Sequence, residues 1–258
     1  MVHEIYAVKF AEHVGTKGGY FFAAPADAHD VPWPIDYFVW LLRSTEGDIV
    51  VDVGFSAATA RKRGRTHLRS PAEALSLLGV DAATVPLVVL SHFHYDHVGD
   101  LGAFEAARFV VQDREMAFWT GRYASRAEFR HVVEVSDLHD LLQANYDGRL
   151  WFVDGDEEIA PGVEVCLIEG HTAGIQAVRV QSARGPVVLA IDASHFYANI
   201  DGDAPFGILH SLAGMYGGFD RLRRLAGRDG IIVPGHDPEI MQRFEPVDGL
   251  EGIAVRIA

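Results

Sequence analysis

Four side chains of metal-binding type lie within the segment Ser91-His92-Phe93-His94-Tyr95-Asp96-His97, in the pattern HxHxDH. His92 and His94 are two residues apart, so on an extended segment their imidazole rings project to one side and can chelate one cation. Asp96 and His97 lie beyond that segment, where the chain turns, and can face a second cation beside the first. The spacing therefore indicates a site for two adjacent metal ions.

Three further ligand candidates follow predicted strands. His171 stands in Glu169-Gly170-His171, Asp192 follows the apolar run Val187–Ile191, and His236 stands in Pro234-Gly235-His236. Loops beyond strand ends are where α/β folds assemble their sites, and a glycine beside His171 and His236 lets the backbone approach closely. We expect these three side chains to join the HxHxDH segment.

The run Val85–Leu90 leads into that segment and is apolar and β-branched, which is typical of a strand buried on both faces. Other strands are predicted at Tyr6–Phe10, Tyr20–Ala23, Tyr37–Leu42, Ile49–Val53, Arg108–Gln112, Leu150–Val153, Val163–Ile168, Ala177–Gln181, Val187–Ile191 and Gly230–Val233. Helices are predicted from an N-cap at Ser70 to about Gly79, and at Asp113–Gly121, Ser125–His131, Ser136–Asn145, Phe219–Ala226 and Pro238–Phe244. This alternation favours an α/β protein, and because no linker divides the chain we expect a single domain over residues 1–258.

The composition excludes several classes of protein. With 22 Lys+Arg against 36 Asp+Glu the formal charge is −14, which repels nucleic acid. The one basic segment, Arg61 to Arg69, is predicted to be a solvated surface loop. Cys166 is the only cysteine, so no disulfide framework exists, and its place in an apolar strand predicts burial. No signal peptide or membrane-spanning run is evident, so we expect a soluble cytoplasmic protein without nucleic-acid or membrane partners.

The motifs together resemble the metallo-β-lactamase superfamily. Val51-Asp52-Val53-Gly54, the HxHxDH segment, His171, Asp192 and His236 occur in the order found in that family. The resemblance implies an αββα four-layer sandwich with mixed, largely antiparallel sheets. It also implies that His92, His94 and His171 hold one metal ion, that Asp96, His97 and His236 hold the other, and that Asp192 bridges both. Asp52 would support the ligand loop through hydrogen bonds.

The ligand set has a chemical consequence. Five neutral imidazoles and two carboxylates leave two divalent ions with a net positive charge, so a water that bridges them should ionise near neutral pH. Such a hydroxide attacks a carbonyl without a serine or cysteine nucleophile. Asp96 or Asp192 can relay the proton to the leaving oxygen. Zn²⁺ is the expected metal, with manganese, iron and cobalt as alternatives that the same ligands suit.

Within the superfamily, the chain is most similar to the N-acyl-homoserine-lactonase branch, on the segments Ile191-Asp192-Ala193-Ser194, Ala204-Pro205-Phe206 and Gly235-His236-Asp237. This implies a quorum-quenching lactonase with a small-molecule substrate. Many relatives form dimers, but no apolar stripe in the sequence points to an interface, so a homodimer is one candidate and the oligomeric state stays open. Lactonases of this branch place a tyrosine three residues after the bridging aspartate, whereas here His195 takes that position and Tyr197 follows. Both are candidate catalytic residues. A histidine there can donate a hydrogen bond, but its charge would change near pH 6.5.

Candidate substrate contacts are aromatic or apolar residues, Phe21, Phe22, Trp33, Trp119 and Met215, with His29-Asp30 in a loop at the mouth of the site. The glycines at 214, 217 and 218 indicate a mobile loop or a turn near the last ligand. The alternatives within the fold are hydrolysis of another ester, a thioester, an amide or a carbamate. An iron-dependent persulfide dioxygenase uses one metal ion, so the intact second ligand set disfavours it. The complete set for two ions also favours an enzyme over a metal-binding module without turnover.

Overall fold

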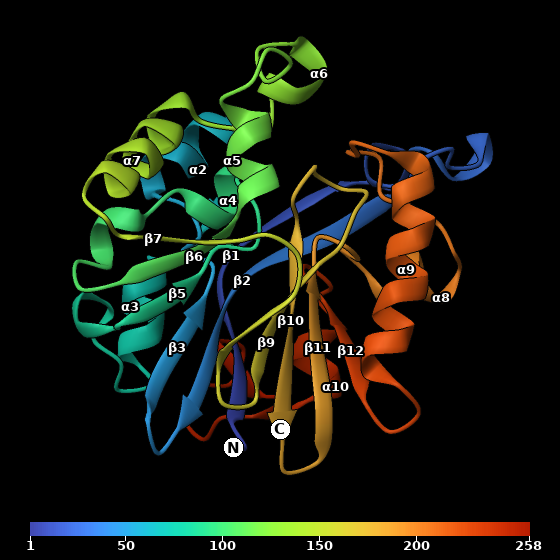
Figure 1. The fold of residues 1–258 in the computed structure, drawn as a ribbon. Coiled ribbons are helices and arrows are strands. Elements are labelled where there is room, and N and C mark those ends of the chain that lie inside the picture. Colours follow the sequence, from blue (N-terminus) through green and yellow to red (C-terminus); the bar gives the residue numbers. More distant parts are fainter.

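The computed structural model describes residues 1–258, and its two β-sheets lie face to face with helices on both outer sides (Figure 1). One sheet has nine strands, β1 (Glu4–Thr16), β2 (Pro32–Ser44), β3 (Gly47–Val51), β4 (Thr66–His67), β5 (Leu87–Val89), β6 (Arg108–Gln112), β7 (Leu150–Val153), β13 (Glu245–Pro246) and β14 (Ala254–Arg256). The other has five, β8 (Glu157–Ala160), β9 (Val163–Leu167), β10 (Gln176–Ser182), β11 (Gly185–Ile191) and β12 (Ile231–Pro234). The predicted αββα sandwich is confirmed.

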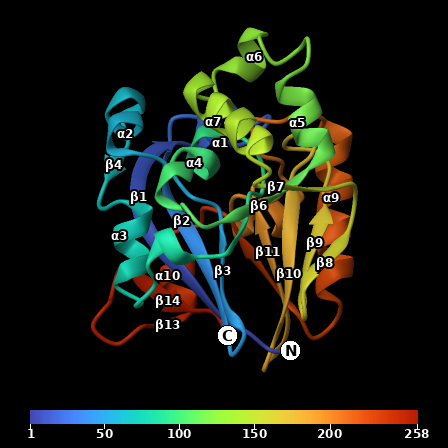
Figure 2. The same ribbon diagram turned by 60° about the vertical axis from the view of Figure 1, so that its left-hand side comes forward.

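The helices are short except for two. They are α1 (Lys17–Tyr20), α2 (Ala57–Arg63), α3 (Pro71–Ser76), α4 (Tyr95–Val98), α5 (Asp113–Trp119), α6 (Ala127–Arg130), α7 (Val135–Tyr146), α8 (Tyr197–Asp201), α9 (Leu212–Ala226) and α10 (Ile240–Arg243), with 3₁₀ turns at Ala26–Ala28, Ala82–Thr84 and Leu101–Ala103. Figure 2 shows α3 and α7 against the larger sheet and α9 against the smaller one. No helix combines the length and the apolar character that crossing a bilayer requires.

Three apolar clusters fill the spaces between the four layers. The first joins the helices α2, α3 and α7 to the larger sheet, the second lies between the sheets, and the third joins α9 to the smaller sheet. Strand β11 contributes to two of them, because Leu189 faces the other sheet while Val188 faces α9. A strand buried on both faces must be apolar throughout, which explains the run Val187–Ile191.

Strand directions bring the ligand loops to one edge of the sandwich. Strands β3, β5, β6 and β7 run parallel, as do β11 and β12, while the remaining pairs are antiparallel. The two sheets are tied together near that edge, where the amide N–H of Gln176 donates to the carbonyl of Ser91 at 3.0 Å. The side-chain amide of Gln176 also donates to the carbonyl of Leu90 at 2.8 Å. These hydrogen bonds hold the start of β10 against the residues that follow β5.

Several local predictions are confirmed. Strands β6 and β7 have the predicted bounds, and α3 begins with a capping box in which Ser70 and Glu73 exchange hydrogen bonds behind a proline at the first turn. Cys166 is fully buried, as expected.

Three local predictions are wrong. The segment Tyr20–Ala23 is not a strand, because α1 ends at Tyr20 and Phe21 makes only an isolated bridge to Phe206. The basic segment is not a loop throughout, since α2 includes residues 61–63 and ends at Gly64 in the left-handed conformation. The glycines at 214, 217 and 218 lie inside α9 rather than in a mobile loop.

Candidate metal centre

Seven predicted ligands converge at one edge of the sandwich in two groups. The first group is His92, His94, His171 and Asp192, and the second is Asp96, His97 and His236; within each group the possible ligand atoms lie within 4.8 Å of one another. All seven side chains are buried except that of Asp96, which is 11% exposed. The residues come from the β5–α4 loop and α4, and from the loops that follow β9, β11 and β12.

The carboxylate of Asp192 lies between the two groups. Its Oδ2 is 3.2 Å from Nε2 of His171 and 3.6 Å from Nε2 of His92, both in the first group. Its Oδ1 is 2.9 Å from Nε2 of His236 and 3.4 Å from Nε2 of His97, both in the second. Each oxygen therefore faces one histidine set, which is the arrangement that a bridging carboxylate requires.

Three of the histidines are oriented by a hydrogen bond at Nδ1. The Nδ1 of His171 lies 2.8 Å from the carbonyl oxygen of Ile208, and the Nδ1 of His236 lies 2.8 Å from the carbonyl oxygen of Asp36. The Nδ1 of His97 lies 2.7 Å from Oδ2 of Asp52. A proton on Nδ1 leaves the lone pair of Nε2 directed into the site. The Nε2 atoms of His92, His97 and His236 are buried without a hydrogen-bond partner. Buried nitrogens of this kind need a partner, and two divalent cations fit them.

Asp52 supports the ligand loop, as the sequence predicted. Its Oδ1 accepts the backbone N–H of Ser91 at 2.7 Å, while its Oδ2 accepts from His97. Asp52 has a positive φ of 61°, and Ile191, which precedes the bridging aspartate, has a φ of 48°. Positive φ is unusual for a β-branched residue, so the surrounding structure must hold Ile191 in place to aim Asp192.

Glu115 is a supporting residue that the sequence analysis missed. Its Oε1 accepts from the N–H of Phe93 at 3.0 Å and from the indole of Trp119 at 2.7 Å, and its Oε2 accepts from the hydroxyl of Thr172 and the N–H of Gly174, both at 2.8 Å. One buried carboxylate thus joins the loop of His92 and His94 to the loop of His171. In the sequence, Glu115 is only an acidic residue in the first turn of a predicted helix, and nothing there indicates its distant partners Thr172 and Gly174.

Burial and mutual charge shift the pKa values of the cluster. Burial lowers the pKa of His92 and of His94 well below the ordinary value, which favours neutral, ligand-competent rings. Burial acts the same way on His97, but the carboxylates of Asp192 and Asp52 outweigh it and raise its pKa well above the usual range. Burial would raise the pKa of Asp192, yet the surrounding histidines hold it well below its ordinary value. The centre therefore keeps its bridging carboxylate ionised.

His195 lies in the site, but its environment differs from the expected one. Its Nε2 is 3.0 Å from Oδ2 of Asp192, and its ring stacks on Phe206 with centroids 3.4 Å apart. Burial lowers the pKa of His195 to about 3, so the ring stays neutral and the expected change of charge near pH 6.5 is corrected. A neutral ring with its proton on Nε2 donates to Asp192, which makes His195 a support of the bridging carboxylate.

Tyr197 is not brought to the centre, and its prediction as a catalytic residue is corrected. It opens α8, where its ring packs in the apolar cluster between the sheets and lies under the guanidinium of Arg243, 3.6 Å from the ring centroid. The backbone N–H of Tyr197 donates to Oδ2 of Asp237 at 2.9 Å, which holds the start of α8 away from the ligand groups.

A cavity of about 70 Å³ opens onto the two ligand groups. Besides ligands and His195, it is lined by Arg65, by the tyrosines Tyr20, Tyr37 and Tyr95, and by the four apolar residues Ile35, Val132, Phe206 and Ile208. The three tyrosines were not predicted from the sequence, although Tyr95 lies within the HxHxDH segment itself. Arg65, which was predicted to lie in a solvated surface loop, lines the cavity instead.

None of the predicted substrate contacts lines that cavity. Phe21 and Trp33 pack edge to face at 5.0 Å, Trp119 lies against the ring of His94, and Met215 lies on the buried face of α9. Phe22 is 46% exposed. His29 and Asp30 pair with each other at 3.3 Å on the surface. Phe21, Trp33 and Trp119 therefore belong to the hydrophobic core, where aromatic side chains are most often found.

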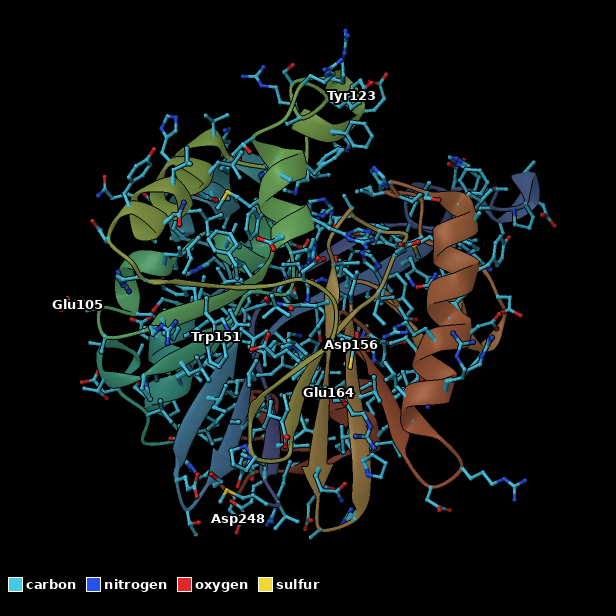
Figure 3. All side chains as sticks on the ribbon, viewed as in Figure 1. Glu105, Tyr123, Trp151, Asp156, Glu164 and Asp248 are labelled. Atoms are coloured by element: carbon cyan, nitrogen blue, oxygen red, sulfur yellow. The ribbon has the colours of Figure 1, made fainter.

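A third group of possible ligands lies away from the cavity. It consists of Asp156, Glu164 and Cys166 on the outer side of the smaller sheet, where Figure 3 labels the two acids. Asp156 forms an ion pair with Arg221 and Glu164 one with Arg179, so the charges of both acids are already neutralised within the protein.

Comparison with known proteins gives a family. The model of the Metallo-beta-lactamase superfamily matches residues 33–236. An N-acyl homoserine lactonase of Bacillus sp is 27% identical over 224 residues, which cover 80% of this chain and 83% of that protein. The N-acyl homoserine lactonase AttM of Azorhizobium caulinodans is 33% identical over 177 residues, covering 67% of this chain and 65% of that one.

A solved structure has the same fold. It is that of an N-acyl homoserine lactone hydrolase with the product N-hexanoyl-L-homoserine bound at the catalytic metal centre, and it superposes with a TM-score of 0.79 over 95% of this chain and 98% of that one, at 21% identity. At this identity the likeness concerns the fold. The loops of the metal centre lie within residues 33–236, which the family model matches.

Proposed function

The chain belongs to the metallo-beta-lactamase superfamily, and on that premise we propose that it is a metal-dependent hydrolase that opens lactones. The single observation that carries the proposal is the position of Asp192, whose two carboxylate oxygens each face one histidine group. Curated relatives that match most of the chain are N-acyl homoserine lactonases, which supports a lactone as the substrate class.

Seven residues would hold the two ions. His92, His94 and His171 would hold one, Asp96, His97 and His236 would hold the other, and Asp192 would serve both. When bound, the ions supply Lewis acidity toward the ester carbonyl and water activation at neutral pH. Imidazole and carboxylate ligands favour Zn²⁺, which we propose as the native metal.

The chain's own residues then direct the reaction. Asp96 reaches the cavity with a partly exposed carboxylate, and it accepts the proton of the attacking water and returns it to the ring oxygen as the ester C–O bond breaks. His195 holds Asp192 in place through Nε2. The water oxygen becomes part of the new carboxyl group, the ring oxygen leaves as a hydroxyl, and the carboxylic acid product loses a proton at neutral pH.

Proton release therefore provides the test. Metal-loaded protein should acidify a weakly buffered solution of γ- and δ-lactones, including acyl-homoserine lactones, and protein stripped by a chelator should not. Metal content should be determined in parallel. A protein that holds two ions per chain but releases no acid from any lactone would contradict the proposal and direct attention to another ester, a thioester or an amide.

Variants separate the roles of the ligands and of His195. Asp192→Ala and His94→Ala should each abolish turnover and lower the metal content, because a buried ligand is lost. His195→Ala should lower kcat by roughly 10- to 100-fold with the metal content kept, because it removes a support and leaves the ligands in place. Full activity in Asp192→Ala would rule out the dinuclear assignment.

A further inference from the structure

The cations of the basic segment Arg61 to Arg69 have different partners in the structure. Lys62 and Arg63 both pair with Glu134, and Arg63 also stacks on the ring of Tyr95 at 3.8 Å. Arg69 donates to the carbonyl of Lys9 at 2.8 Å. Arg65 has no carboxylate partner within 4.0 Å, although it lines the cavity at the metal centre.

The guanidinium of Arg65 is held in place by neutral groups. Its Nε donates to the hydroxyl of Tyr95 at 3.1 Å and its Nη1 donates to the carbonyl of Arg63 at 3.1 Å. Its Nη2 makes no hydrogen bond within the protein. The hydroxyl of Tyr95 in turn lies 3.3 Å from that of Tyr37, which also lines the cavity. The side chain is therefore oriented, and the N–H groups of Nη2 stay free.

The groups around Arg65 do not neutralise its charge. Tyr20, Tyr37 and Tyr95 are protonated at neutral pH, since a free phenol has a pKa of about 10 and burial raises that of Tyr20 to about 12. His13 also faces Arg65, and burial lowers its pKa, so it is neutral too. Asp96 in the same cavity is committed to the metal centre. A half-buried guanidinium without a counter-ion is a ready binding site for an anion.

The hydroxyl of Tyr20 is a second unpartnered donor in this wall. Its oxygen is buried and makes no hydrogen bond, while its ring stacks on Phe206 with centroids 5.5 Å apart. A buried hydroxyl costs free energy unless something binds it. Arg65 and Tyr20 together therefore present hydrogen-bond donors to the same cavity, and the hydroxyl of Tyr20 and the Nη2 of Arg65 make no hydrogen bond within the protein.

The volume of the cavity limits what can bind there. At about 70 Å³ it is far smaller than the roughly 300–1,000 Å³ of pockets that enclose drug-sized ligands. Its lining is partly apolar, and Arg65 is the one arginine or lysine in it. A compact substrate with an acidic group matches both features.

We propose that Arg65, oriented by Tyr95, binds a carboxylate carried by the substrate, so that the preferred substrates are compact lactones that bear a carboxylate near the ring. Arg65 is a specificity-determining residue here and takes no part in proton transfer. The inference rests on the proposed lactone hydrolysis. It gives the site an anionic substrate class, in which the carboxylate accepts charge-assisted hydrogen bonds from Nη2 of Arg65 and a hydrogen bond from the hydroxyl of Tyr20.

The test compares a γ-butyrolactone that carries a carboxylate on its γ-carbon with the matching neutral carboxamide. Metal-loaded wild-type protein should hydrolyse the acid with a kcat/KM at least tenfold above that of the amide. N-hexanoyl homoserine lactone should also be at least tenfold poorer than the acid. Arg65→Gln should remove the preference for the acid, and Arg65→Lys should keep part of it, because lysine retains the charge without the planar donor edge.

Arg61→Gln is the matched control. Arg61 lies on the same basic segment with an exposed side chain, so its loss removes one positive charge without touching the cavity. Tyr95→Phe is a second variant that keeps the guanidinium and removes the hydroxyl that orients it, and it should lower the preference several-fold. Metal content should stay equal in all variants.

Calorimetry supplies a readout besides turnover. The ring-opened dicarboxylate should bind metal-loaded wild type and Arg61→Gln with equal affinity, and Arg65→Gln at least tenfold more weakly. Equal hydrolysis of acid and amide by the wild type would overturn the proposal. So would an equal loss for both substrates in Arg65→Gln, since Arg65 would then bind the carboxylate formed at the reacting carbonyl. If no lactone is hydrolysed while calorimetry behaves as expected, lactone hydrolysis fails and the anion site stands.

Discussion

At the scale of single residues, the orientation of His97 depends on Asp52. The carboxylate fixes the proton on Nδ1 of His97, and an amide in its place would present either oxygen or nitrogen to the ring. Asp52→Asn should therefore lower the affinity for the second metal ion by about 10- to 100-fold while the fold is kept. Competition with a chromophoric chelator measures this. Unchanged affinity would show that backbone geometry alone orients His97.

Asp137 makes the stability depend on pH. Burial raises its pKa from 3.8 to about 6, and its Oδ2 has no hydrogen-bond partner. Since the folded state holds this proton more tightly than the unfolded state, the contribution of Asp137 is greatest below pH 4 and is lost as the pH rises through 6. Asp137→Asn should thus raise Tm by a few degrees at pH 8 and have little effect at pH 4. Calorimetric scans at both pH values measure it, and a larger gain at pH 4 would contradict the sign.

At the scale of elements, the glycines of α9 have two different roles. A Cβ on Gly218 would lie 3.0 Å from the carbonyl oxygen of Glu169, whereas one on Gly217 would meet nothing within 4 Å. Gly217→Ala should stabilise the protein by about 1 kcal/mol because alanine favours the helix. Gly218→Ala should destabilise it, because α9 must move away from the loop that carries His171. Denaturant unfolding of the two variants makes a matched comparison, and equal effects would contradict the close approach.

The same glycines show what the sequence could and could not predict. Glycine weakens an isolated helix, so local propensity favoured a turn at residues 214–218, and contact with Glu169 and Gly170 overrides it. By contrast, the N-terminus of α3 depends on Ser70 and Glu73 alone and was predictable. The metal ligands were predictable because their residue types and strand-end positions are visible locally. The roles of Glu115 and Arg65 depend on distant partners, such as Thr172 or a missing carboxylate, that no local pattern shows.

At the scale of the whole molecule, the metal centre joins both sheets. His92 to His97 follow β5 of one sheet, while His171, Asp192 and His236 follow strands of the other, and one apolar cluster lies between them. We therefore propose that residues 1–258 unfold as one domain. Ions that bind only the folded state add about 4 kcal/mol at 1,000 times Kd, so chelation should lower Tm by roughly 10 °C. Scans with and without chelator measure this, and an unchanged Tm would show that the ions do not stabilise the contact between the sheets.

The division of the ligands between the sheets also governs the order of events during synthesis. The ribosome releases the HxHxDH segment long before β12 and His236 exist, so a nascent chain displays half a binding site without its bridging carboxylate. A complete centre forms only after β12 has paired in parallel beside β11. The complete ligand set is accordingly among the last features of the fold to form, because its seventh member, His236, follows the strand β12.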